Sequence, residues 1–164
     1  MALKSVTAAR LRELLEYDPE TGVFVSLTNR GRNTTAGRVA GGMGPNGYLV
    51  IRLDSVQYRA HRLAWLYMTG EWPEHEIDHI NGDKADNRFA NLRDVVRSVN
   101  QQNLRVAHRS SRSGLIGAWR RRDRWEAKIR VDGKQRHIGL FDTPEAAHEA
   151  YLAAKRRLHE GCTI

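Results

Sequence analysis

The stretch that decides the fold of this chain is residues 76–103, EIDHINGDKADNRFANLRDVVRSVNQQN. Asp78 and His79 stand side by side near its start. Asn91 lies thirteen residues after Asp78, and Asn100 lies nine residues after Asn91. A turn signal at Asn-Gly-Asp separates two short runs with strand character, and a helical run follows them. Two strands and one helix would therefore bring a carboxylate, an imidazole and carboxamides together from distant positions.

Side chains of these types suit phosphodiester hydrolysis with one divalent metal ion. Asp78 is a hard oxygen ligand that favours Mg²⁺ or Mn²⁺, and Asn100 can supply a neutral carbonyl oxygen. Because side chains alternate along a strand, His79 would lie opposite Asp78 and could take a proton from the attacking water. We expect Asn91 to bond backbone across the loop or to hold the His79 ring. The alternative, an ordinary surface turn, is disfavoured by the full spacing.

Residues 1–45 predict a small α/β region. Thr7 can cap a short helix that carries leucines on one face, and a strand is expected over residues 23–25. The chain from residue 31 to residue 47 is rich in Gly, Asn and Thr, which indicates a loop.

A hairpin and a helix are expected next. Residues 48–60 predict a hairpin that turns at Asp54 and Ser55. Apolar side chains at helical spacing follow over residues 61–69, and Gly70 is the expected helix end. The helix that carries Asn100 would begin further on, with Ser98 as its N-cap and Gln101 as its capping-box partner.

The chain after residue 104 predicts a second unit. Residues 105–113 are basic, Ser-rich and unpatterned, and they are interpreted as a linker between domains at 46–104 and 114–164. Within the second domain, three strands are expected over residues 116–120, 124–131 and 135–141, with a tight turn at Asp132-Gly133. A helix would then open at Thr143 and Pro144, carry an alanine-rich buried stripe, and end at Gly161.

Composition and charge indicate a polyanionic partner. Lys and Arg number 27 against 19 Asp and Glu, which gives a net charge of +8. Residues 61–100 carry more acidic than basic side chains, whereas residues 101–164 are strongly basic. An acidic middle suits a cation site, and a basic end suits a phosphate backbone. The alternative is a basic surface that is only solvated.

Cysteine usage and hydropathy exclude several classes of protein and of metal site. Cys162 is the single cysteine, which excludes a disulfide within one chain and a zinc site built from paired cysteines. No apolar run approaches the roughly 18 residues that a membrane span needs. The N-terminus lacks the apolar core and cleavage site of a signal peptide. We therefore expect a soluble, intracellular protein.

Residues 46–104 resemble the HNH endonuclease family, in its phage and intron-homing branch with Asn at the last motif position. The matching residues are Asp78, His79, Asn91 and Asn100, and the upstream HRLAWLYMTGEWP is similar to the segment that precedes the motif in that branch. The resemblance implies a ββα-metal site in which His79 is the general base and Asp78 and Asn100 are metal ligands. Asn at the last position favours Mg²⁺ or Mn²⁺ over Zn²⁺.

Two residues just upstream of the motif are secondary candidates. Arg62 could hold a phosphate, or it could take part in a local salt bridge at the start of its helix. His61 precedes it, and its role stays open.

Residues 114–161 resemble the plant ethylene-response-factor (Apetala-two) DNA-binding domain, which also occurs in phage nucleases. The matching features are Trp-x-Ala-x-Ile-Arg at 125–130, Gly-Leu-Phe-x-Thr at 139–143 and Ala150-Tyr151 in the alanine-rich helix. By analogy the sheet would contact DNA, with arginines on phosphates rather than on bases. Trp125 is interpreted as a core residue. The candidate DNA-binding residues are Arg62, Trp119, Arg120, Arg121, Arg122, Arg124, Lys128, Arg130 and Arg136.

We therefore expect an α+β protein. A ββα-metal nuclease domain would be preceded by a small α/β region and followed by a three-stranded antiparallel sheet packed on one helix. The expected function is metal-dependent nicking or double-strand cleavage of DNA, as in a phage-type homing endonuclease. The alternatives are a sequence-specific DNA-binding regulator with an inactive nuclease domain and an RNA-binding accessory protein. The oligomeric state is open, with a monomer favoured.

Overall fold

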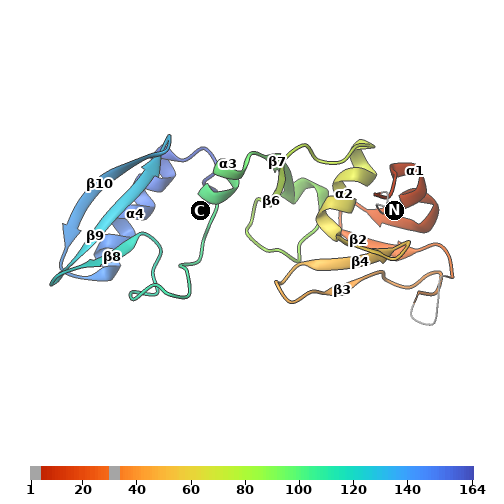
Figure 1. Cartoon of the computed structure of the whole chain (residues 1–164), viewed down its shortest axis with the longest axis horizontal. Helices are drawn as coiled ribbons and strands as arrows, with labels where there is room; N and C mark the ends of the chain where they lie inside the picture. Colours follow the sequence, from red (N-terminus) through yellow and green to blue (C-terminus); the bar gives the residue numbers. More distant parts are fainter. Residues whose placement is uncertain (1–4, 30–33) are drawn as a thin grey trace. The chain divides into compact units, whose positions relative to one another are not determined.

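The computed structural model of this chain describes residues 5–29 and 34–164. The chain divides into two compact units, residues 1–95 and 96–164 (Figure 1). Each unit combines helices with small antiparallel sheets, which is compatible with the expected α+β class.

The first unit begins with helix α1, Ala8–Leu14, and a hairpin. The hydroxyl of Thr7 accepts a hydrogen bond from the backbone N–H of Arg10 at 3.2 Å, so Thr7 is the predicted N-cap. Strands β1, Leu15–Asp18, and β2, Val23–Ser26, pair antiparallel directly after the helix.

A second small sheet follows in the same unit. Its strands, in spatial order, are β3 (Gly42–Met43), β4 (Leu49–Leu53) and β5 (Val56–Arg59). The predicted turn between β4 and β5 is confirmed, because Asp54 and Ser55 both have positive φ angles, 46° and 68°. Such angles match the twist of a two-residue hairpin. β3 lies inside the segment predicted as a loop, and residues 31–33 of that segment lie outside the described residues.

Helix α2, Ala60–Thr69, continues from β5 as predicted and ends at Gly70, whose φ is 85°. Its apolar face enters the main core of the first unit, because its leucines pack with those of α1 and with the aromatic residues of the first hairpin. The fully buried members of this core include Leu11, Leu15, Phe24, Leu53 and Leu63. This packing fixes the N-terminal turn of α2, where His61 lies.

The last element of the first unit is the predicted hairpin. β6, Glu76–His79, pairs antiparallel with β7, Leu92–Val95, and a short 3₁₀ helix, Phe89–Asn91, precedes β7. The sequence predicted two short strands on either side of the Asn-Gly-Asp turn, and β6 and β7 are these strands.

The second unit begins with helix α3, Arg97–Gln102. The predicted cap at Ser98 is wrong, because the N-cap is Val96, whose side chain has no acceptor, and Ser98 lies within the helix. The cap preference of serine is worth only about 1 kcal/mol, which tertiary contacts outweigh.

The remainder of the second unit is a sheet and a helix. Its strands lie in the order β10 (Lys134–Phe141), β9 (Arg124–Val131) and β8 (Ala118–Arg121). Helix α4, Pro144–Leu158, lies against one face of this sheet (Figure 1). The hydroxyl of Thr143 accepts from the N–H of Ala146 at 3.2 Å, as predicted. The helix ends at Leu158 with His159 as its C-cap, rather than at Gly161.

The division between the two units differs from the linker expected over residues 105–113. The chain divides after Val95, so α3 and the segment that follows it are grouped with the C-terminal sheet. Hydrogen bonds from the C-terminal residues to Gln102 and Leu104 account for this grouping.

Candidate functional site

Asp78 and His79 lie next to each other at the end of β6, and both are buried, with 6% and 5% of their surface exposed. Arg93 stands directly opposite Asp78 in the hairpin register. Its guanidinium donates to Asp78 Oδ2 from Nε at 2.9 Å and from Nη2 at 2.7 Å. A buried carboxylate is costly without such compensation. Sequence reasoning missed Arg93, although counting the hairpin register outward from the turn would have found it.

His79 packs against two aromatic rings. Its ring centroid lies 4.9 Å from that of His61, edge to face at 85°, and 6.0 Å from that of Tyr48. His61 is itself buried, with 3% exposed, and its ring lies 5.1 Å from Tyr48. The partners of His79 thus differ from those of Asp78, as strand alternation predicts. Two elements, α2 and the segment before β4, supply these rings.

Burial keeps the His79 imidazole neutral. Desolvation lowers the pKa of His79 below its usual value, while the Asn87 side chain and nearby aspartates act in the opposite direction. A neutral imidazole has one nitrogen lone pair, which can accept a proton. His79 is therefore in the protonation state that a general base needs at pH 7.

His61 is also neutral. Burial, together with His79 and two arginines, lowers the pKa of His61 to about 3. Its Nδ1 is buried and makes no hydrogen bond within the described part of the chain. His61 is thus a fixed, uncharged ring beside His79. The sequence marked it only as a secondary candidate.

Asn91 holds the loop of the hairpin. Its Oδ1 accepts from the N–H of Asn81 at 2.9 Å, and its Nδ2 donates to Asn81 Oδ1 at 3.0 Å and to the carbonyl of Asp86 at 2.8 Å. The sequence left two roles open for Asn91, and this geometry corresponds to the first of them, bonding across the loop. A catalytic role for Asn91 stays a prediction.

Two cations flank Tyr48 beside the histidines. The Arg59 guanidinium lies 4.6 Å and the Lys84 ammonium 4.9 Å from the centre of the Tyr48 ring. Such positions are within the range of cation–π contacts. Sequence reasoning missed these residues because they come from a strand end and a turn with no motif of their own.

Arg62 makes local contacts. Its Nη1 donates to the carbonyl of His75 at 3.4 Å, and its guanidinium lies 5.7 Å from the Trp72 ring centre. Both contacts are local, but neither is the salt bridge that the sequence considered, and contact of Arg62 with DNA stays a prediction.

Asn100 lies on α3, in the second unit. Asp78, His79 and Asn91 lie in the first unit. The pairing of Asn100 with Asp78 on one metal ion therefore stays a prediction from the motif.

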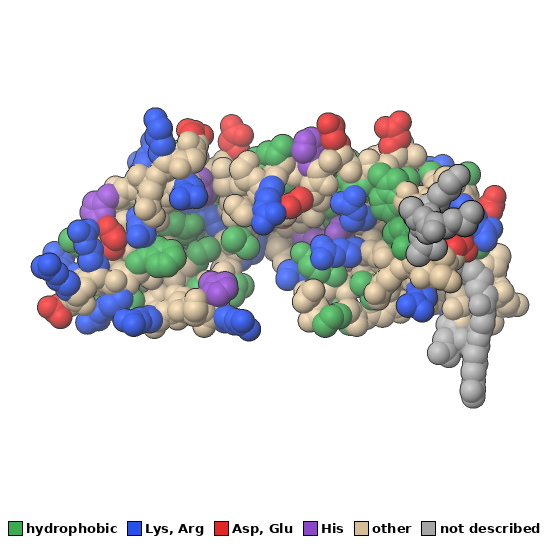
Figure 2. All heavy atoms as spheres, in the orientation of Figure 1, with side chains coloured by type: hydrophobic (Ala, Val, Ile, Leu, Met, Phe, Trp, Pro, Cys, Tyr) green, Lys and Arg blue, Asp and Glu red, His purple; other side chains and the backbone are tan. Residues whose placement is uncertain are grey.

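The sheet of the second unit has one face against α4 and one face away from it. Strand alternation places Ala127 and Ile129 on the helix side, where both are buried. We call the other side the outer face. Five predicted DNA-binding residues lie on it: Trp119, Arg121, Arg124, Lys128 and Arg130. Figure 2 shows Lys and Arg side chains gathered over this part of the chain, at the left of the view.

Internal contacts organise the outer face around Glu126. Its carboxylate lies 3.1 Å from Arg121, 3.7 Å from Lys128 and 3.0 Å from His137. Partial burial opposes ionisation, but His137, Lys128 and Arg121 hold the pKa of Glu126 below its usual value. The Lys128 ammonium also lies 5.2 Å from the exposed ring of Trp119. These long side chains are thereby held on the face.

The other three predicted arginines of the sheet lie elsewhere. Arg120 is paired with Trp125 on the helix side, and its guanidinium lies 5.2 Å from that ring. Arg122 lies in the turn between β8 and β9, with a φ of 55°. Arg136 is paired with the buried Ile129. The structure therefore separates the predicted arginines into two groups.

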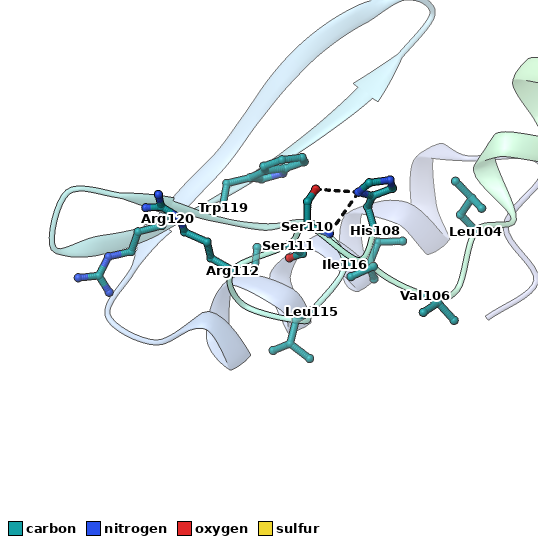
Figure 3. Close-up of a pocket in the computed structure, with 13 residues that line it drawn as sticks. Leu104, Val106, His108, Ser110, Ser111, Arg112, Leu115, Ile116, Trp119 and Arg120 are labelled. Carbon is teal, nitrogen blue, oxygen red and sulfur yellow. Dashed lines mark hydrogen bonds between the residues drawn. The ribbon is translucent and has the colours of Figure 1, made fainter.

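The segment before β8 lines an apolar groove with a volume of about 530 Å³. Leu104, Val106 and Trp119, on its wall, are exposed apolar residues. Figure 3 shows this wall, with His108 Nδ1 bonded to Ser110 Oγ at 2.7 Å. The segment that the sequence predicted as an unpatterned linker is thus held by local side-chain bonds.

The site offers a metal ion oxygen donors, such as Asp78, and the ring nitrogens of two histidines. Among residues 5–29 and 34–164, no three His, Cys, Asp or Glu side chains lie together as a metal-binding group. A divalent ion here would use few protein ligands, such as Asp78 and a carboxamide, and complete its shell with water and phosphate. Mg²⁺ is commonly bound in this way.

Comparison with known protein families finds a match in the central part of the chain. Residues 58–102 match the HNH endonuclease family. The matched segment includes Asp78, His79, Asn91 and Asn100, and it supports a nuclease whose substrate is DNA. No curated protein and no solved structure matches the chain. The HNH segment begins in β5 and ends at the last residue of α3, so it extends across the division between the units.

None of the helices in the described part of the chain is long and apolar enough to cross a membrane.

Proposed function

We propose that this protein is a metal-dependent endonuclease that hydrolyses phosphodiester bonds in double-stranded DNA. The observation that carries the proposal is the buried Asp78–His79 pair at the centre of the HNH segment. The neutral His79 ring has the protonation state of a base, and the neighbouring Asp78 side chain is paired with Arg93.

His79 acts as the general base. Its neutral imidazole accepts a proton from the water that attacks the phosphorus atom. The edge-to-face contact with His61 and the ring of Tyr48 hold its orientation. Asn91 supports the same geometry from the loop side, because it fixes Asn81, two residues after His79.

Asp78 and Asn100 would hold the metal ion. A carboxylate and a carboxamide oxygen suit Mg²⁺ or Mn²⁺ better than Zn²⁺. A bound divalent ion supplies charge stabilisation at the leaving oxygen. Arg93 keeps the Asp78 carboxylate in place through Oδ2, and Arg59 and Lys84 add positive charge near the histidines.

The outer face would hold the DNA. Trp119, Arg121, Arg124, Lys128 and Arg130 share this face, and the cations suit phosphate contacts. The specific form that we propose is a phage-type homing endonuclease with an ethylene-response-factor type DNA-binding domain, acting in the cytoplasm of a bacterial or phage-infected cell. A DNA-binding regulator is the second candidate, because the outer face alone would suffice for it.

A plasmid-relaxation assay separates these functions. The full chain should convert supercoiled plasmid to nicked or linear DNA with Mg²⁺ or Mn²⁺, and excess EDTA should stop the reaction. A protein that binds duplex DNA but never cuts it would be the regulator. Stronger binding to single-stranded RNA than to duplex DNA would instead indicate an RNA-binding protein.

A further inference from the structure

The helix that carries Asn100 is bonded to the C-terminal end of the chain. α3 ends at Gln102, whose Oε1 accepts a hydrogen bond from the N–H of Gly161 at 2.9 Å. The next residue, Asn103, is buried, and its Oδ1 accepts from the hydroxyl of Thr163. Two successive side chains at the end of α3 are thus held by residues almost sixty positions further along the chain.

A second set of bonds holds the chain just beyond α3. The Lys155 ammonium donates to the carbonyl of Leu104. Lys155 is a buried residue, and burial lowers its pKa. A buried ammonium is costly unless it is hydrogen-bonded, so the bond to Leu104 offsets part of the cost of burying Lys155. Arg105 adds hydrogen bonds to Thr163, at 3.0 Å to its carbonyl and at 2.7 Å to its hydroxyl.

Gly161 shows how closely the C-terminal residues approach α3. A Cβ at this position would lie 2.3 Å from the carbonyl oxygen of Val99 and 3.0 Å from Cβ of Gln102. Gly161 does not have one of the positive φ angles that favour glycine, so its backbone conformation does not require glycine. The position requires glycine because the backbone lies directly against α3.

We propose that Lys155, Gly161 and Thr163 form a C-terminal anchor that positions α3 and thereby Asn100 for the nuclease. The proposal rests on the proposed function, in which Asn100 is a metal ligand. All three residues lie beyond the HNH segment, which ends at residue 102. They are positioning residues, because they act through α3.

The second unit contains both the outer face, which would bind DNA, and the helix that carries Asn100. The outer face and α3 belong to the same unit, and the anchor holds α3 there. A change in the anchor should therefore move Asn100 without changing the residues that bind DNA. Geometry at a reacting centre is sensitive to small displacements, so cleavage should fall while DNA affinity stays.

The sharpest variant is Gly161→Ala, because its Cβ would press on Val99 and Gln102. Thr163→Val removes the hydroxyl and keeps the side-chain shape. Glu160→Ala is the matched control, since Glu160 is exposed in the same segment. The full chain is used throughout, with Mg²⁺ as the metal. Amide hydrogen exchange of α3, duplex DNA affinity, thermal unfolding and cleavage rate at saturating DNA are measured for each variant.

In Gly161→Ala and Thr163→Val, we expect the backbone amides of Asn100 and Asn103 to exchange about tenfold faster than in the wild-type chain. A change of this size corresponds to the loss of one buried hydrogen bond. The cleavage rate should fall by about tenfold or more, as for a misplaced catalytic group. DNA affinity and the unfolding temperature of the sheet should match those of Glu160→Ala.

Three results would overturn the proposal. Unchanged exchange in both variants would show that the anchor does not hold α3. Faster exchange with wild-type cleavage would show that the position of α3 does not matter for the reaction. Equal losses of DNA binding and cleavage would show a purely structural role. If the wild-type chain never cuts DNA, the proposed function fails and the link to cleavage fails with it, whereas the exchange result still decides whether the anchor exists.

Discussion

At the scale of the residue, the two neighbours Asp78 and His79 occupy different environments. Arg93 neutralises the buried carboxylate, whereas the imidazole lies among rings that favour its neutral form. Because side chains alternate along a strand, the carboxylate and the imidazole lie in these two different environments although they are only one residue apart.

The first prediction concerns His79 as the base. His79→Ala should lower the cleavage rate by roughly 10²–10⁴-fold, the usual contribution of a positioned general base, and DNA affinity should stay unchanged. Because burial lowers the pKa of His79, its neutral form persists below the ordinary value of about 6.5. Activity should therefore fall only as the pH drops below that value. The pH–rate profile of the variant should lack this limb, and a retained limb would assign it to another group.

The second prediction concerns Glu126, an acidic side chain that contacts Arg121, Lys128 and His137 on the outer face. Glu126→Gln keeps the shape of the side chain and removes a negative charge that would repel phosphate. Duplex DNA should bind more tightly, and the gain should shrink as salt is raised. Fluorescence anisotropy at two salt concentrations measures it. Weaker binding by the variant would mean that Glu126 holds these cations in the orientation that DNA needs.

At the scale of the element, the sequence predicted what local chemistry determines. Thr7 and Thr143 cap their helices, and Asp54-Ser55 makes the hairpin turn, because each depends on a few consecutive residues. The start of α3 was missed at Ser98. That helix is held by residues 155–163, which no local pattern shows.

The candidate site likewise contains residues that the sequence predicted and residues that it missed. The motif named Asp78 and His79, and both are buried side by side. Arg93 and Tyr48 were missed, because finding them needs the register of the hairpin and the approach of a separate sheet. The sequence left two roles open for Asn91, bonding across the loop and holding the His79 ring. Only the three-dimensional structure can distinguish these roles, and its hydrogen bonds lie across the loop.

The third prediction concerns the loop of the hairpin. Asn91→Ala removes three hydrogen bonds to residues 81–86. The free energy of unfolding of the first unit should fall by about 1–3 kcal/mol, as for other buried polar groups left unpaired. The cleavage rate should fall too, whereas the acid limb of the pH profile should stay in place. Urea denaturation and a pH–rate profile test this, and a shifted limb would mean that Asn91 acts on the His79 ring directly.

At the scale of the whole molecule, the chain divides the proposed task between two units. The first contains the Asp78–His79 pair, and the second contains α3 and the outer face. A fragment ending at residue 104 would lack the C-terminal anchor, so we expect it to lose cleavage as well as DNA affinity.

The fourth prediction concerns DNA binding by the outer face. Arg130→Ala should reduce the slope of log affinity against log salt by about 0.9, the value for one phosphate contact. Arg157→Ala is the matched control, because Arg157 is exposed on α4, which covers the opposite face of the sheet. Its slope should remain that of the wild-type chain. Equal effects of the two substitutions would show that only net charge matters.

Plasmid cleavage by Asp78→Ala at saturating DNA with Mg²⁺ is the decisive experiment for the metal-dependent site. The wild-type chain should cut, and the variant should bind DNA equally well without cutting. Asp78→Asn, which keeps the side-chain shape beside Arg93 but removes the charge, should also be inactive. Full cleavage by Asp78→Ala, or by the wild-type chain in excess EDTA, would contradict a metal-dependent nuclease site at this hairpin.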